Sequence, residues 1–201
     1  MSKKFLFAML AAALAAGVLT GCGKKSGKSE SSSAEEKSIK ARTIAEDEKL
    51  GITFSEDKKT LVKYNADLKD TEYAIPEGVT EIGPYAFHAC PKLTNVKIPS
   101  SVKTIGDHAF EECENLTNVT ILKGVTEIGD YAFAKCWNLK SVTIPEGVTF
   151  IGRGAFKKCG NLTSVKIPSS VKTVGNISFG GCPCEKSVKK QFPEYKSYGE
   201  E

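Results

Sequence analysis

The sequence predicts a β-rich solenoid of about five 23-residue coils, with a parallel sheet along one face. Two residue types recur five times each at an interval of 23 residues: Phe87, Phe110, Phe133, Phe156 and Phe179, and Cys90, Cys113, Cys136, Cys159 and Cys182. Isoleucine, valine and glycine positions keep the same interval, beginning at Ile75, Val79 and Gly83. A fixed period of this size is typical of stacked units that bury their apolar faces only against their neighbours.

The first residues have the features of an export signal. Lys3 and Lys4 precede an apolar run, residues 5–18, that is too short to span a membrane and typical of a secretory signal. The segment Leu19-Thr20-Gly21-Cys22 resembles a bacterial lipobox, which implies cleavage before Cys22 and attachment of lipid to that residue. We therefore expect a signal peptide over residues 1–21 and export to the cell envelope, at the outer membrane or cell surface. An ordinary signal peptide or an uncleaved anchor are the alternatives.

Residues 22–45 are predicted to form a lipidated, disordered tether. From Gly23 to about Lys40 the chain is rich in Ser, Lys, Gly and Glu and lacks apolar side chains large enough to form a core. Without Lys3 and Lys4, the 26 basic and 24 acidic side chains give a formal net charge of +2. Such a small excess does not favour a nucleic-acid partner, because proteins that bind nucleic acids cluster Lys and Arg on one face.

Each coil is expected to begin with a short strand. In the unit that starts at Leu93, Val96 and Ile98 alternate with Asn95 and Lys97, so one side of the strand is buried and the other exposed. A proline follows in most units, where a missing N–H costs least. Equivalent residues of successive coils would then lie about 4.8 Å apart in a parallel sheet.

The rest of each coil is expected to return along the other side as irregular, turn-like chain. Val102 and Ile105 are three residues apart and both apolar. Gly106 is expected to supply a backbone angle that other residues resist. The segment 107–110 is expected to form a helical turn that places Phe110 in the centre of the coil.

A solenoid exposes apolar coils at its ends unless caps cover them. Before the array, Ile52 and Phe54 alternate, residues 55–59 form a turn signal and residues 61–64 are again apolar-rich. This pattern predicts a β-hairpin cap over residues 46–74.

The repeats themselves occupy residues 75–183, and a second cap is expected after them. A helix is predicted to begin after Pro183 within residues 184–201, with loose chain beyond Pro193. One apolar stripe at i, i+4 and i+8 would cover the open end of the array. The stripe consists of Cys184, Val188 and Phe192.

The repeat L-x-x-V-x-I-P-x-x-V-x-x-I-G-x-x-A-F-x-x-C closely resembles the BspA-like leucine-rich repeat, over roughly residues 73–183. The resemblance implies a leucine-rich-repeat solenoid in a bacterial surface or secreted protein, often lipid-anchored and acting as an adhesin. Three positions depart from the pattern: Leu122 replaces the proline, Ser178 the alanine and Glu185 the leucine. The last two departures indicate that the array is ending.

The cysteines and histidines do not form a recognisable catalytic motif. Stacked cysteines have parallel Cα–Cβ bonds, so the ladder predicts buried free thiols rather than disulfides, and it does not bring ligands together around a metal. Cys182 and Cys184 are interpreted as structural, with a thiol redox pair as the alternative. His88 and His108 are expected on the return side in solvent. We predict no enzyme and no cofactor.

A ligand is expected on the exposed side of the strands. The candidate residues form a flat polar field and are Asn95, Lys97, Asn118, Thr120, Ser141, Thr143, Ser164 and Lys166. Trp137 is a further candidate, because the repeat does not require an aromatic residue there. The face lacks aromatic or arginine anchors, so binding to a protein or surface ligand would be modest or multivalent. The alternative is a periplasmic envelope protein without a specific ligand. A monomeric array is expected in both cases.

Overall fold

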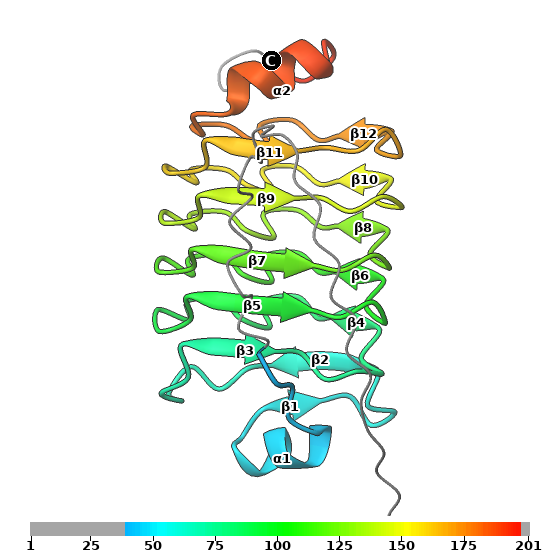
Figure 1. Cartoon of the computed structure of the whole chain (residues 1–201), viewed down its shortest axis with the longest axis vertical. Coiled ribbons are helices and arrows are strands. Elements are labelled where there is room, and N and C mark those ends of the chain that lie inside the picture. Colours follow the sequence, from blue (N-terminus) through cyan, green and yellow to red (C-terminus); the bar gives the residue numbers. More distant parts are fainter. Residues whose placement is uncertain (1–38, 198–201) are drawn as a thin grey trace, which may run out of the picture. The chain divides into compact units, whose positions relative to one another are not determined.

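The computed structural model describes residues 39–197, which form a stack of coils with two parallel sheets along it (Figure 1). The predicted signal peptide, Cys22 and most of the predicted tether lie outside the described residues. The solenoid of about five coils is confirmed. The expectation of irregular return chain is wrong, because a second sheet runs along that side.

One sheet has five strands, which are the predicted strands of the repeat. They are β3 (Glu72–Ala74), β5 (Asn95–Ile98), β7 (Asn118–Ile121), β9 (Ser141–Thr143) and β11 (Ser164–Lys166). Each strand pairs in parallel with its equivalent in the next coil, as where Val96 pairs with Val119. Val96 and Ile98 are fully buried, whereas Asn95 and Lys97 stay partly exposed. The apolar residues of the strand therefore face the core and the polar residues face outward, as the sequence predicted.

The other sheet has seven short strands, of which five belong to the return segments of the coils. They are β1 (Thr53–Phe54), β2 (Thr60–Lys63), β4 (Glu81–Ile82), β6 (Thr104–Ile105), β8 (Glu127–Ile128), β10 (Phe150–Ile151) and β12 (Thr173–Val174). The return segments are extended because one residue of each pair, such as Ile105, points into the core. Two-residue strands are too short for a period-two pattern to reveal them in the sequence.

The repeat glycines serve close packing rather than an unusual backbone angle. At Gly106, a Cβ atom would lie 2.7 Å from the backbone oxygen of Ile82 in the preceding coil. The Gly106 N–H donates a hydrogen bond to that oxygen at 2.8 Å, and this bond joins the two coils. The expectation of a special angle at Gly106 is therefore wrong, and the missing side chain is what the coil spacing requires.

The segment after each glycine forms turns, not the predicted helical turn. His108 has a φ of 56°, in the left-handed region that interrupts a helix. Its N–H donates to Asp130 O in the next coil at 2.8 Å, and the Phe110 N–H donates to Ala132 O at 2.7 Å. Backbone donors that would close a helix locally therefore join one coil to the next.

The core contains a continuous ladder of phenylalanine rings. Phe110 and Phe133 stack with centroids 5.0 Å apart and an angle of 1° between the rings, and Phe133 and Phe156 follow at 5.2 Å and 5°. The rings of Phe87 and Phe179 extend the ladder at either end. All five side chains are fully buried. Burial of this kind is the main stabilising contribution to a repeat array.

The ladder cysteines are buried free thiols, and most of them also donate hydrogen bonds to the backbone. The Cys113 thiol donates to Phe87 O at 3.0 Å and the Cys136 thiol to Phe110 O at 3.2 Å. Cys159 and Cys182 repeat the contact with the phenylalanine of the preceding coil. The Phe110, Phe133 and Phe156 oxygens also accept a backbone N–H within their own coil, so the thiol adds a second hydrogen bond that joins neighbouring coils, which a purely apolar side chain would not do.

The N-terminal cap contains the predicted hairpin and a helix that was not predicted. β1 and β2 pair antiparallel, and β2 then pairs in parallel with β4. The helix α1 (Ile44–Lys49) begins at a capping box, in which the Thr43 N–H donates to the Glu46 carboxylate at 2.7 Å. The chain is thus ordered before residue 46, and the predicted end of the tether at residue 45 is placed too late. Helices this short give little periodic signal.

A buried carboxylate fastens the N-terminal segment to the first coil. Asp47 is fully buried; Arg42 Nε lies 2.6 Å from its Oδ1, and the Tyr73 hydroxyl donates to its Oδ2 at 2.5 Å. Arg42 Nη1 also contacts Asp70 at 2.7 Å. Residues 42–47 are therefore part of the folded unit.

The C-terminal cap is the predicted helix, α2 (Glu185–Gln191), which lies across the end of the stack (Figure 1). Its stripe is confirmed: Cys184 and Val188 are buried and Phe192 is half-buried. The expected loose chain beyond Pro193 is wrong for Tyr195, which is 2% exposed. Its hydroxyl accepts a hydrogen bond from the Phe179 N–H at 3.0 Å, so the chain turns back to close the last coil.

Candidate functional site: the polar strand face

The strand face, defined by the eight predicted polar residues of the five-stranded sheet, lies on one side of that sheet. Pairing in register places Asn95 opposite Asn118, and Lys97 opposite Thr120. Further along, Ser141 pairs with Ser164, and Thr143 with Lys166. The sheet therefore brings together the residues that the sequence spaces 23 positions apart.

The exposure of this face increases towards the C-terminal coils. Asn95 and Lys97 are half-buried, whereas the four residues in β9 and β11 are exposed. Glu72 in β3 pairs with Asn95 and begins the same row. The prediction missed this residue although its spacing was visible, because the first coil departs from the repeat at Asp70 and Tyr73.

A row of threonines flanks the strand face at the start of the strands. Thr94 donates its hydroxyl hydrogen to Thr71 O at 3.0 Å, and Thr117 donates to Thr94 O at 2.9 Å. These donors are used within the array, so the hydroxyl oxygens offer mainly acceptor lone pairs to a ligand.

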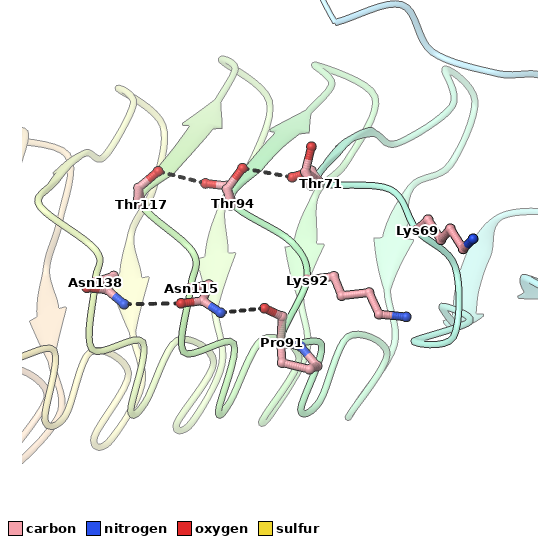
Figure 2. Close-up of a pocket in the computed structure, with 8 residues that line it drawn as sticks. All are labelled: Lys69, Thr71, Pro91, Lys92, Thr94, Asn115, Thr117 and Asn138. Carbon is pink, nitrogen blue, oxygen red and sulfur yellow. Dashed lines mark hydrogen bonds between the residues drawn. The ribbon is translucent and has the colours of Figure 1, made fainter.

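A second polar row lies on the loops that precede the strands. Asn115 donates to Pro91 O at 2.7 Å and Asn138 donates to Glu114 O at 2.9 Å. Between this row and the threonine row is an open groove of about 690 Å³, with Lys69 and Lys92 at one end (Figure 2). None of the residues that line this groove belongs to the predicted site. Their 23-residue recurrence was the signal that could have identified them.

A second depression, of about 460 Å³, lies where the strands end. It is lined by two residues of the strand face, Thr143 and Lys166, together with apolar chain that includes Leu122 and Ile144. Leu122 stands where most repeats have proline. Here the polar strand face therefore adjoins an apolar surface.

Trp137 lies apart from the strand face, on the loop that also contains Asn138. It is 43% exposed, and a Cβ atom on Gly160 of the next coil would lie 3.7 Å from its ring. The indole therefore lies next to Gly160, at a distance where a Cβ atom would make only ordinary van der Waals contact. Trp137 does not line either groove.

The thiols of Cys182 and Cys184 do not have the environment of a redox pair. Both are buried, and the Cys182 thiol donates to Phe156 O at 2.9 Å. The hydrogen bond between the two side chains and their burial raise the pKa of Cys184 well above its usual range. A reactive cysteine needs the opposite shift.

The histidines lie on the return side, as expected, but His108 is not simply in solvent. Its ring stacks between Tyr85 at 4.7 Å and Tyr131 at 5.1 Å, and its Nδ1 lies 2.7 Å from the Glu111 carboxylate. Burial opposes ionisation of Glu111, but hydrogen bonds with His108 and Lys135 outweigh it and lower the pKa of Glu111. This cluster is therefore internally paired.

Residues 39–197 contain neither a metal-binding cluster nor a membrane-spanning helix. No group of three or more His, Cys, Asp or Glu side chains in this part of the chain is arranged to hold a metal ion. No helix among these residues has the length and apolar composition needed to cross a membrane.

Comparisons with known proteins identify the repeat. The profile of the BspA type leucine rich repeat region matches residues 64–185 in six copies, which is more than half of the chain. No curated protein matches the chain.

Several solved structures match parts of this chain. The pneumococcal vaccine antigen PcpA has 21% identity and a TM-score of 0.54 over 66% of this chain and 35% of its own. A leucine-rich repeat protein from Bacteroides ovatus has 33% identity and a TM-score of 0.49, over 65% and 43% of the two chains. The T. pallidum leucine-rich repeat protein has 25% identity and a TM-score of 0.45, over 73% and 94%. The chain thus spans about a third of the length of the PcpA chain.

Proposed function

Because the chain belongs to the BspA-type leucine-rich-repeat family, we propose that it is a non-enzymatic, lipid-anchored bacterial surface protein whose array binds a protein or cell-surface ligand. The observation that supports binding most directly is the strand face, a regular polar surface built by in-register pairing. A rigid sheet presents such groups in fixed positions, which lowers the ordering cost of binding.

The chemistry of the face indicates how it would bind. It presents hydroxyls, amides and the two ammonium groups of Lys97 and Lys166, without an exposed aromatic residue or an arginine. Interfaces of high affinity usually contain such anchors, so we expect moderate affinity that falls with added salt. Several copies on one cell surface would strengthen attachment through multivalency.

The strand face is tested by charge reversal in the full-length protein. Asn95, Asn118, Lys97 and Lys166 are replaced together by Glu or Asp, and Trp137→Ala is made separately. We expect adhesion of cells expressing the first variant to drop to the level of cells without the protein, at equal surface amounts. Loss of adhesion only in Trp137→Ala would move the site to the loop edge, and adhesion retained in both variants would contradict binding through the strand face or through Trp137.

The anchoring proposal concerns residues outside the described part of the chain. We propose that residues 1–21 are removed, that Cys22 receives lipid and that the following segment links it to Arg42, where the folded unit begins. Cys22→Ser should prevent acyl labelling and release most of the protein from the membrane fraction. Membrane retention without any acyl label in the unmodified protein would show an uncleaved anchor instead.

A second candidate function is that of an envelope protein held in the periplasm without a specific ligand. The observation in its favour is the absence of anchor residues on the strand face, since a solvated sheet looks the same. Treating intact cells with a protease separates the two candidates. Digestion of the array on intact cells supports the surface protein, and digestion only after the outer membrane is opened supports the periplasmic one.

A further inference from the structure

The near balance of charges in the whole chain conceals a separation along the array. Residues 153–197 contain nine Lys or Arg and two Glu, a formal net charge of +7. Residues 39–152 contain 13 Lys or Arg and 17 Asp or Glu, a net charge of −4. Because the coils stack in sequence order, this difference in sequence becomes a difference in position. The last coils and α2 form a basic end (Figure 1).

Among the described residues, most of the exposed cations of the basic end form no ion pair with a carboxylate. Within residues 39–197, the ion pairs between side chains join residues from Arg42 to Lys135. At the basic end, Glu185 is engaged by the Gly181 N–H at 3.2 Å and by the Tyr195 hydroxyl at 3.2 Å. The other acid, Glu194, is a single exposed residue. The exposed cations that this one carboxylate cannot balance are Arg153, Lys158, Lys166, Lys172, Lys186, Lys190 and Lys196.

These cations lie on several sides of the stack. Lys158 is on the return loop after β10, Lys172 directly precedes β12 of the seven-stranded sheet, and Lys166 is in β11 of the five-stranded sheet. Lys186 and Lys190 are exposed on α2, opposite the buried Val188. A flat bilayer could meet only some of these groups at once. A flexible, linear polyanion can follow them around the end.

The composition of the basic end also distinguishes among polyanions. Eight of its nine cations are lysines, which act as point charges rather than as planar, two-pronged ligands. Single-stranded nucleic acids are bound with exposed aromatic rings on which bases stack. The exposed large apolar residues in the described chain are Leu50, Val62, Tyr85 and Trp137, all outside residues 153–197.

We propose that the basic end, residues 153–197, is a binding site for a sulfated polysaccharide. Sulfate groups along a flexible chain provide closely spaced negative charges that can pair with the cations of the basic end. Binding would be electrostatic, with fast association steered by the field of the basic end and a strong dependence on salt. This site is separate from the strand face except at Lys166.

The test uses heparin as the probe and the full-length protein. Lys158, Lys172, Lys186 and Lys190 are replaced together by Gln (K158Q, K172Q, K186Q, K190Q). The control variant carries K59Q, K63Q, K103Q and K123Q, which remove the same charge from exposed positions before residue 153. Thermal unfolding first establishes that both variants retain the stability of the unmodified protein.

We expect the basic-end variant to bind immobilised heparin at least tenfold more weakly, and the control variant to bind within about twofold of the original. By analogy with counterion release from nucleic acids, the slope of log K against log salt should decrease by roughly three for four lost contacts. Uncharged dextran should not bind. Equal weakening in both variants would overturn the proposal, because net charge and not this end would then decide binding.

A second arm of the experiment tests the membrane as the alternative partner. Vesicles of phosphatidylglycerol and phosphatidylcholine are offered to the same proteins. Vesicle binding that the four basic-end substitutions abolish, without any binding to heparin, would overturn the proposal in favour of a membrane contact. Heparin binding that survives all four substitutions would overturn it as well.

Discussion

Removal of one ring from the middle of the phenylalanine ladder should destabilise the whole array. Phe133 is fully buried and stacks on Phe110 and Phe156, with centroids 5.0 and 5.2 Å away. Phe133→Ala leaves a cavity between two rings that the surrounding coils hold apart. The expected cost is about 3–5 kcal/mol, within which each lost stacking contact contributes roughly 0.5–1.5 kcal/mol.

The assay is urea and thermal unfolding followed by circular dichroism, since the protein has a single tryptophan and the control removes it. For a chain of this length the cost corresponds to a decrease in Tm of roughly 6–20 °C. Trp137→Ala is the matched control, because it removes a larger ring from the next turn of the same coil, where the side chain is 43% exposed. That change should stay within about 0.5 kcal/mol.

The position along the ladder gives a second comparison. Phe179 is also fully buried but stacks on only one phenylalanine, Phe156, at 5.1 Å. Phe179→Ala should therefore cost less than Phe133→Ala. Unfolding of Phe133→Ala no earlier than Trp137→Ala would contradict a stabilising ladder, and so would a larger loss of stability in Phe179→Ala than in Phe133→Ala.

Two further predictions concern buried polar groups. Burial raises the pKa of Cys136 in the folded state, whereas an unfolded thiol has a pKa of about 8.5. As the pH rises above that value, the thiol loses its proton in the unfolded state only. The free energy of unfolding should therefore decrease as the pH rises. The free energy of unfolding should fall by up to about 1.4 kcal/mol per pH unit for each such thiol. In urea unfolding between pH 7 and pH 9.5, Cys136→Ala should therefore lose less stability than the unmodified protein. An equal loss would contradict this assignment. Arg42→Met leaves the fully buried Asp47 carboxylate with only the Tyr73 hydroxyl, and should cost about 3 kcal/mol and expose residues 39–50 to proteolysis. Protection equal to that of the unmodified protein would show that the hairpin, not this ion pair, holds the N-terminal segment.

The N-terminal cap shows where sequence patterns reach their limit. The hairpin could be predicted because its strands alternate around a turn signal, whereas α1 spans only six residues and has no apolar stripe. Its stability depends on Asp47 reaching Arg42 and Tyr73, which lies 26 residues further along. A contact between residues so far apart leaves no local pattern in the sequence.

The candidate site also has one part that could be predicted from the sequence and one part that could not. The eight residues of the strand face could be predicted, because strand alternation and the 23-residue period together place them on one surface. The threonine and asparagine rows also recur at this interval, but the groove between them could not be predicted, because it depends on how the loops before the strands pack beside the sheet (Figure 2). The separation of charge was present in the sequence, but only the order of the coils makes it an end of the molecule.

By itself the sequence determined the solenoid, the number of coils, the phenylalanine and cysteine ladders and the two kinds of cap. It could do so because each depends on residues that repeat at a fixed interval or alternate locally, and neighbouring coils are the only packing partners. Only the tertiary structure decided that the return chain is a second sheet, that Gly106 permits close approach to Ile82 O and that Tyr195 closes the last coil. These features depend on distances between coils, and a pattern of residue types along one chain does not contain those distances.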